Sequence, residues 1–210
     1  MGQVKNLRTR QKEERRKRIL DAARALFFER GYVSATIKDI ADNAAVSPPT
    51  VHKYYGTKQL LLFDLVLDCE SEIASEIKTK IAIEKNPVKS ATFLLTQIIE
   101  GALTRIDRKT WMHAYSVFGN QPIDGQNRSF ESILAEQYDG LEKVFADLQV
   151  DGGLSPMFDG RTARELLQTV NSSLFKKLLI KEIDLKDYRK KIKNSVRFVL
   201  EPHVLNGSHT

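Results

Sequence analysis

The stretch 36–58 constrains this chain most, because it encodes two short helices joined by a tight turn. Thr36 is a good N-cap for the first helix. Four apolar residues follow at the i, i+3, i+4, i+7 spacing of one helical face: Ile37, Ile40, Ala41 and Ala44. Ser47 can cap the second helix, whose first residues Pro48 and Pro49 cost little because N–H groups there have no helical partner. The cap bond should then come from the N–H of Thr50, since Pro49 has none. The pattern predicts a helix-turn-helix.

The second helix has the size and surface chemistry of a helix that reads DNA. From Pro48 to Tyr55 it should be about 12 Å long, and the major groove of B-DNA is about 12 Å wide. Val51 and Tyr55, four residues apart, can pack inward. The outward residues carry groups that hydrogen-bond base edges and phosphates: Thr50, His52, Lys53 and Tyr54. An αα-hairpin with polar caps fits the same stretch, so the flanking sequence has to decide.

The net charge of the chain lies ahead of this motif. Of the 210 residues, 33 are Lys or Arg and 27 are Asp or Glu, which gives a formal net charge of +6. Residues 1–18 contain eight of the basic and two of the acidic side chains, and so carry the whole net charge. A basic arm before a helix-turn-helix is typical of nucleic-acid binding, and some such arms enter the minor groove. The expected partner is double-stranded DNA.

Other classes of protein find little support. No apolar run of signal-peptide length follows the basic start, and no segment has the roughly 18 apolar residues that cross a bilayer. We therefore expect a soluble, cytoplasmic protein with no membrane partner. Cys69 is the only cysteine and the four histidines are scattered, so no disulfide, metal site or cofactor is expected. The chain also lacks a Gly-rich phosphate loop and a nucleophile elbow, which argues against an enzyme.

Helical periodicity continues along the whole chain and predicts an all-α fold. The first helix should start in the basic arm and end at Arg30, before Gly31. A long helix should run from 58 to about 83. Further helices are expected at 88–105, 107–118, 128–149, 160–181 and 185–201. The predicted domains are the basic arm with the start of the first helix (1–18), the helix-turn-helix domain (19–57), a second helical domain (58–201) and a disordered tail (202–210).

The last two predicted helices each carry an apolar stripe. The first stripe consists of Ala163, Leu166, Leu167, Val170, Leu174 and Leu178, and the second of Tyr188, Ile192, Val196 and Val199. Two adjacent amphipathic helices can dimerise as a four-helix bundle. The same stripes can instead close the core of a single chain, and periodicity leaves both possibilities open.

Residues 17–66 resemble the N-terminal domain of the TetR family of transcriptional regulators. The segment 18–32, which ends in Gly31-Tyr32, resembles the first helix of that family. The second helix is matched by Thr36-Ile37 and Asp39-Ile40-Ala41. The third helix and the start of the fourth are matched by Val46-Ser47 through Tyr55, Lys58 and Leu61-Leu62. Beyond residue 66 the resemblance is limited to length and helical character.

The resemblance implies a homodimer whose two helix-turn-helix domains bind a near-palindromic operator, most often as a ligand-responsive repressor. The domain 58–201 would form the dimer interface through its C-terminal helices and bind a small-molecule effector. By position, Pro49, Thr50, His52 and Lys53 match residues near base edges. Thr36, Tyr54 and Lys58 match residues that touch phosphates, and Ser47 and Pro48 complete the predicted DNA-binding set.

Three residues depart from the usual family pattern. Ala45 occupies a turn position where the family usually has Gly, and it would cost about 1 kcal/mol if the turn needs a positive φ. Pro49 replaces a usual Gly and His52 a usual Tyr. These changes leave DNA binding as the expectation but alter the groups that would read the bases.

An effector pocket is expected among apolar and aromatic residues of the central helices. The candidates are Phe93, Trp111, Met112, Tyr115 and Phe118. Trp111 and Tyr115 are favoured because each has a polar group that seeks a partner when buried, although all five can equally be core residues. Two other functions stay open: non-specific nucleic-acid binding, and an uncharacterised enzyme in the C-terminal domain. A regulator should prefer its site over random duplex by about 10³ or more.

Overall fold

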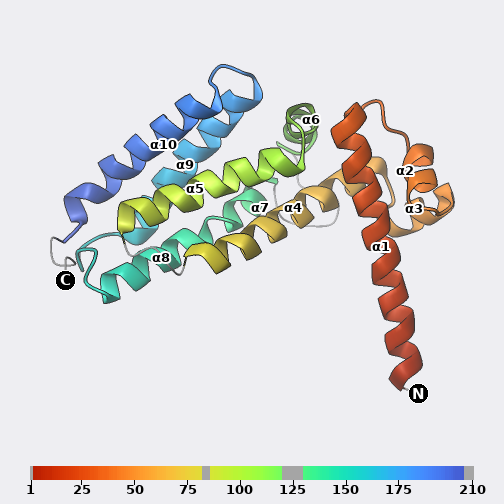
Figure 1. Cartoon of the computed structure of the whole chain (residues 1–210), viewed down its shortest axis with the longest axis horizontal. Coiled ribbons are helices and arrows are strands. Elements are labelled where there is room, and N and C mark those ends of the chain that lie inside the picture. Colours follow the sequence, from red (N-terminus) through yellow and green to blue (C-terminus); the bar gives the residue numbers. More distant parts are fainter. Residues whose placement is uncertain (1, 82–85, 120–129, 206–210) are drawn as a thin grey trace. The chain divides into compact units, whose positions relative to one another are not determined.

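The structure is a computed structural model that describes residues 2–81, 86–119 and 130–205 (Figure 1). Within these ranges the only β-structure is one isolated bridge, and the predicted all-α fold is confirmed. No helix there combines the length and apolar character needed to span a bilayer. The α-helices are α1 (Gly2–Arg30), α2 (Ile37–Asn43), α3 (Pro48–Tyr55), α4 (Lys58–Ile81), α5 (Pro87–Arg105), α6 (Arg108–Phe118), α7 (Phe130–Glu136), α8 (Asp139–Val150), α9 (Gly160–Leu179) and α10 (Leu185–Leu200).

The chain forms two compact units, and their boundary differs from the predicted one. The first unit contains the chain up to Cys69 together with Thr104–Ser116, and the second contains Glu70–Leu103 and the chain from Val117 onward. The sequence predicts a boundary at residue 58, where α4 begins. The first half of α4 instead belongs to the first unit, in which Asp64 pairs with Arg16 of α1.

The first three helices form the predicted helix-turn-helix headpiece. Helix α1 packs against α2, and α2 packs against α3. The apolar face predicted for α1 is buried and consists of Ile19, Ala22, Ala23, Leu26 and Phe27. Gly31 ends α1 with a φ of +78°, which glycine adopts without steric cost. Thr36 caps α2, because its hydroxyl accepts from the Asp39 N–H at 3.1 Å while the Asp39 carboxylate accepts from the Thr36 N–H at 2.9 Å.

Ala45, in the turn between α2 and α3, adopts the left-handed conformation with a φ of +52°. The N–H of Val46 donates to the carbonyl of Ala41 at 2.9 Å, which is the helix-ending bond of a Schellman turn. A residue with a Cβ is strained by roughly 1 kcal/mol in this region. The turn does need a positive φ at Ala45, so the expected conformational cost of an alanine there applies.

In the second unit, α8 packs against α9 and α9 against α10 (Figure 1). A polar cluster joins these helices to α5. The Asn171 amide donates to the Leu95 carbonyl at 3.2 Å and to the Tyr138 hydroxyl at 3.1 Å. The Tyr188 hydroxyl lies 2.8 Å from the Leu95 carbonyl oxygen and 2.9 Å from the side-chain carbonyl oxygen of Asn171. Three helices and the residue preceding α8 thus meet at one buried amide.

The single helix predicted at 128–149 is wrong, because α7 ends at Glu136 and α8 begins at Asp139. The Tyr138 N–H donates to the Ala135 carbonyl at 3.0 Å, which closes a tighter turn than an α-helix has. The Gln137 amide donates to the Leu134 carbonyl at 2.8 Å and so takes up a helix-terminal acceptor. The break lets Tyr138 reach Asn171. Residues 128 and 129 lie outside the described part of the chain.

The end of the chain is more ordered than predicted. A 3₁₀ helix, Glu201–His203, follows α10, and Val204 forms an antiparallel bridge with Leu154. The Ser155 N–H donates to the His203 carbonyl at 2.9 Å, and the Leu205 N–H donates to the Gly153 carbonyl at 3.2 Å. The prediction of disorder is therefore wrong for residues 202–205. Residues 206–210 lie outside the described ranges.

The strain at Ala45 gives a direct stability prediction. Ala45→Gly should raise the free energy of unfolding by about 1 kcal/mol, because glycine adopts a positive φ without the Cβ clash. Ala44→Gly is the matched control. Ala44 has a φ of −80° and is buried, so the same change there should be destabilising by roughly 0.5–1 kcal/mol. Urea unfolding of both variants checks this, and a destabilised Ala45→Gly protein would contradict the strain argument.

Candidate nucleic-acid interface

Helix α3 is anchored by two residues, and its other side is open. Val51 is 0% exposed and Tyr55 is 5% exposed, which confirms the predicted inward pair. The Tyr55 hydroxyl donates to the backbone carbonyl of Arg16 on α1 at 2.8 Å, and burial raises the pKa of Tyr55 to about 12. The phenol therefore stays protonated and able to donate. His52 and Lys53 are exposed, while Thr50 and Tyr54 are half-buried.

The start of α3 differs from the predicted cap. The Ser47 side chain makes no cap bond to a backbone N–H. The Thr50 N–H instead donates to the backbone carbonyl of Ser47 at 2.9 Å, and the two hydroxyls lie 2.9 Å apart. The predicted side-chain cap is wrong because the Ser47 carbonyl reaches that N–H first. Ser47 and Pro49 are exposed at the start of α3, and Pro48 is half-buried.

His52 is oriented by the residue that ends α3. Its Nδ1 lies 2.7 Å from the backbone carbonyl oxygen of Gly56. A carbonyl only accepts hydrogen bonds, so Nδ1 must carry the proton. The neutral ring therefore leaves the lone pair of Nε2 available, whereas the imidazolium form would offer a second N–H there. This fixes the tautomer of an exposed residue on the predicted reading face.

Lys58, Tyr32 and His113 form a stack within the first unit. The Lys58 Nζ lies 4.3 Å from the centroid of the Tyr32 ring and 3.4 Å from the Val33 carbonyl oxygen. The Tyr32 ring stacks on His113 of α6, with centroids 4.1 Å apart and planes inclined by 25°, and its centroid lies 5.2 Å from that of Phe27. Burial lowers the pKa of Lys58, and burial followed by the charge of Lys58 lowers the pKa of His113. The sequence analysis did not find this stack, because it links side chains far apart in the chain.

The basic arm is helical, which differs from an extended arm that would enter the minor groove. Helix α1 begins at Gly2, and its side chains from residue 7 to residue 18 are exposed. Arg16 pairs with Asp64 at 2.5 Å, and Arg24 pairs with Asp68 at 2.6 Å, so α1 is fixed to α4 at two points. Partial exposure keeps each pair modest in energy, but together they hold the direction of α1.

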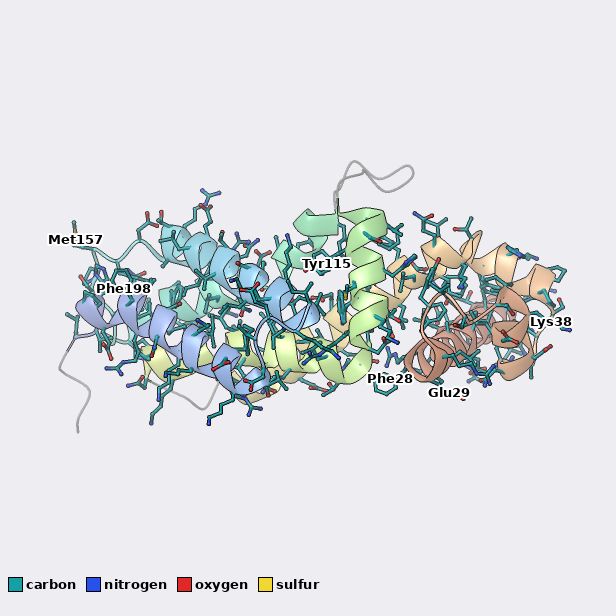
Figure 2. All side chains as sticks on the ribbon, turned by 90° about the horizontal axis from the view of Figure 1, so that it is seen from above. Phe28, Glu29, Lys38, Tyr115, Met157 and Phe198 are labelled. Carbon is teal, nitrogen blue, oxygen red and sulfur yellow. The ribbon has the colours of Figure 1, made fainter. Side chains whose placement is uncertain are left out.

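The predicted effector-binding residues are divided between the two units. Trp111, Met112 and Tyr115 lie in the part of α6 that belongs to the first unit, whereas Phe93 and Phe118 belong to the second. Trp111 is fully buried, and its ring centroid lies 6.4 Å from that of Tyr115. Tyr115 is labelled on α6 in Figure 2. Met112 is 45% exposed, so it lies away from the Trp111 face. An open depression along α1 is lined by polar and charged residues and is unlike the apolar pocket that was expected.

The sequence analysis missed an acid in the core of the second unit. Glu70 has a buried Oε2 with no hydrogen-bond partner, and burial raises its pKa to about 8. The sequence pattern indicates that Glu70 faces inward, because Val66 four residues before it and Ile73 three residues after it are both buried. An acid on the apolar face of a helix is unusual enough to mark the position.

The C-terminal apolar stripes mostly close the core of the chain itself. The buried members are Ala163, Leu167, Leu174, Leu178, Tyr188, Ile192 and Val196. Leu166 is 53% exposed, Val170 and Val199 are half-buried, and Phe198, which the stripes did not include, is 84% exposed on α10 (Figure 2). The apolar surface left for contact with another molecule is therefore smaller than the two predicted stripes together.

Comparison with known proteins places the headpiece in a family. Residues 19–65 match the model of the tetR family of bacterial regulatory proteins. The HTH-type transcriptional regulator HbdR of Aromatoleum sp. (strain CIB) is 38% identical over 77 residues, which cover 37% of this chain. The aligned part spans about a third, 34%, of that relative.

Two further similarities extend over most of the chain. An HTH-type transcriptional repressor of Mycobacterium tuberculosis (strain H37Rv) is 27% identical over 197 residues, covering 91% of this chain and 92% of the relative. The crystal structure of FadR from Thermus thermophilus, a TetR-family transcriptional repressor in complex with lauroyl-CoA, has a TM-score of 0.66 at 22% identity and covers 93% of this chain and 98% of that one. This structural likeness concerns the fold.

The lowered pKa of His113 predicts how stability depends on pH. The unfolded chain protonates this histidine near its usual pKa of about 6.5, while the folded chain resists protonation. The contribution of His113 to stability should therefore fall as the pH drops below about 6.5, until the pH passes the lower folded pKa. His113→Phe keeps an aromatic ring against Tyr32 but cannot titrate. In urea unfolding, the stability of the wild type relative to this variant should fall between about pH 7 and pH 5, and a difference that stays constant would refute the assignment.

Proposed function

The chain belongs to the TetR family of bacterial regulatory proteins, and from this premise we propose that it is a sequence-specific DNA-binding transcriptional regulator. It acts in the cytoplasm as a homodimer on a near-palindromic operator and responds to a small-molecule effector, as a repressor. The exposed face of α3 carries this proposal. Val51 and Tyr55 are buried, so the helix can present its other side to a groove while staying attached to the headpiece.

The proposed base contacts come from Thr50, His52, Lys53 and Pro49. Because His52 is held by the Gly56 carbonyl, its neutral ring can accept a hydrogen bond from an amino group of cytosine or adenine in the major groove. Lys53 can donate to guanine or to a phosphate. The hydroxyl pair of Ser47 and Thr50, next to Pro48, lies where α3 would enter the groove.

The proposed phosphate contacts come from Thr36, Tyr54 and Lys58, and from the basic part of α1. The Lys58 ammonium is positioned by the Tyr32 ring and the Val33 carbonyl rather than being free to rotate. The exposed basic residues on the helical arm supply a sequence-independent attraction to the duplex, which weakens with salt. Affinity would then depend on α1 and Lys58, and sequence preference on α3.

The homodimer is proposed to form through α9 and α10. These helices are joined by the short segment 180–184 and pack against each other. Leu166 and Phe198 lie at equal sequence distances from the middle of that segment, so an antiparallel hairpin brings them to the same level. With the half-buried Val170 and Val199 they form an apolar face that a second copy can cover through a two-fold contact.

Effector response requires a ligand that binds one headpiece spacing better than another. Half-sites of helix-turn-helix dimers lie about 34 Å apart, so a small tilt of α4 would prevent both headpieces from docking. Helix α4 begins with Lys58, and Tyr32 connects Lys58 to His113 of α6. A TetR-family repressor with this fold is known in complex with lauroyl-CoA, which supports a small-molecule effector here without indicating its chemistry.

Selection of bound duplexes from a random pool with the full chain tests the proposed function. The bound sequences should show dyad symmetry, with half-sites about one helical turn apart. His52→Phe should change the preferred base at one position of each half-site, because the ring remains but both nitrogens are lost. Lys143→Ala, on the exposed side of α8, is the control and should select the wild-type site. A featureless pool would support non-specific nucleic-acid binding and contradict the regulator proposal.

The apolar face on α9 and α10 predicts the effect of a second substitution. Phe198→Ser should weaken dimerisation roughly 30-fold, about 2 kcal/mol, because a largely exposed aromatic side chain would lose its place in the interface. Met157→Ser is the matched control, since Met157 is 90% exposed but lies outside α9 and α10 (Figure 2). Analytical ultracentrifugation measures both variants. Unchanged dimerisation of Phe198→Ser would exclude this face as the interface.

A further inference from the structure

We propose that the polar cluster around Glu70, Tyr138 and Asn171 in the second unit is the effector site, and that it takes a small molecule with a protonated amine on an apolar body. This inference rests on the proposed ligand-responsive function and names the ligand class. It differs from the aromatic set that the sequence suggested on α5 and α6.

Glu70 is the first element of the argument. It lies on α4, and its Oε2 is buried without a hydrogen-bond partner. A buried carboxyl oxygen without a partner costs free energy, because it has lost its hydration without gaining a hydrogen bond. Burial raises the pKa of Glu70 to about 8, so the folded chain holds the acid in its neutral form near neutral pH. A cation beside Glu70 would reverse this, because it stabilises the carboxylate.

The second element is the hydrogen-bonded cluster next to Glu70. A charge on Glu70 acts electrostatically on Tyr138, whose pKa burial raises to about 12. Tyr138 accepts from the Asn171 amide, and the Asn171 side-chain carbonyl lies 2.9 Å from the Tyr188 hydroxyl. These groups are fixed by one another. They form a rigid polar wall, which a ligand site requires.

The third element is a set of buried side-chain oxygens that have no hydrogen-bond partner and belong to residues close in sequence to members of the cluster. They are Thr92 Oγ1, Gln137 Oε1 and Gln168 Oε1. Thr92 lies one helical turn before Leu95, Gln168 lies one turn before Asn171, and Gln137 directly precedes Tyr138. Among the described residues of the second unit, Arg164 Nε is the one buried unpartnered nitrogen, and its guanidinium pairs with Asp139.

The balance of these groups decides the chemistry of the ligand. Four buried oxygens can accept hydrogen bonds, and the one comparable nitrogen belongs to a group that is already paired. All four can be paired by a ligand that brings donors, and an ammonium brings three of them together with the charge that Glu70 favours. An apolar body is expected because the second unit has an apolar core, which includes Ile73, Leu94 and Phe175. An anionic or purely hydrocarbon ligand would leave the acceptors unpaired.

The position of Glu70 also gives the site a route to DNA binding. Helix α4 carries Lys58 at its start and Glu70 just after the first unit ends. An amine that ionises Glu70 and inserts beside it acts on the helix that also supplies a proposed phosphate contact. The ligand then changes operator affinity only by the difference between its affinities for the two states of α4.

Matched probes with the full chain test the inference. Phenethylamine, 2-phenylethanol and 3-phenylpropionate share an aromatic body and differ in charge. Only the amine should raise the thermal unfolding midpoint, and Glu70→Gln should weaken its binding by about tenfold or more, measured by calorimetry. Glu76→Gln, an exposed acid on the same helix, is the control and should bind the amine like the wild type. Preference for the anion, failure of the amine to bind, or equal binding by both variants would overturn the inference.

Two further readouts separate this inference from the proposed function. Amine binding is measured without DNA. A protein that binds the amine but selects no duplex would therefore contradict the proposed regulator function and still support the amine-binding site at Glu70. Without ligand, the contribution of Glu70 to stability should fall as the pH rises from about 4.5 to about 8, because only the folded state holds the Glu70 proton in that range. The stability of the wild type relative to Glu70→Gln should therefore fall over that range, since the opposite contribution of His113 is common to both proteins. A difference that does not change with pH would show that the carboxyl is not held neutral.

Discussion

The attachment of α3 through Val51 and Tyr55 is the contact on which the proposed interface depends. Burial of these two side chains fixes the rotation of a two-turn helix that could not be stable alone. The Tyr55 hydroxyl extends the contact to the backbone of α1, where Arg16 also pairs with Asp64 of α4. The outward direction of His52 and Lys53 follows from that anchoring, as does the direction of the basic helix.

The hydrogen bonds that start α2 and those that join the helices of the second unit differ in range. In the headpiece, Thr36 and Asp39 bond each other near the surface and start α2. In the second unit, Asn171 joins α5, α9 and α10, while Glu70 close by has an oxygen without a partner. Acceptors without hydrogen bonds cost free energy in a core, even when a fully bonded network lies nearby. Such a cost is expected at a functional site, where a bound ligand would supply the hydrogen bonds.

The sequence predicted most of the headpiece because its signals are local. Helical spacing placed Val51 and Tyr55 inward, and the cap residue Thr36 located the start of α2. Periodicity failed at 128–149, since nothing local reveals that Tyr138 leaves the helix to meet a residue 33 positions away. It also failed to decide between core and dimer face for the C-terminal stripes, because a buried stripe has the same pattern in both cases.

By itself, the sequence determined an all-helical chain, a basic start, and a helix-turn-helix with Val51 and Tyr55 turned inward, since short-range sterics and helical periodicity govern all of these. Only the tertiary structure decided that α4 is divided between two units and that Lys58 and His113 meet at the Tyr32 ring. It alone brought Glu70 within electrostatic range of Tyr138. Desolvation and hydrogen bonding between distant residues depend on what packing brings together, and one helix cannot encode that by its own pattern.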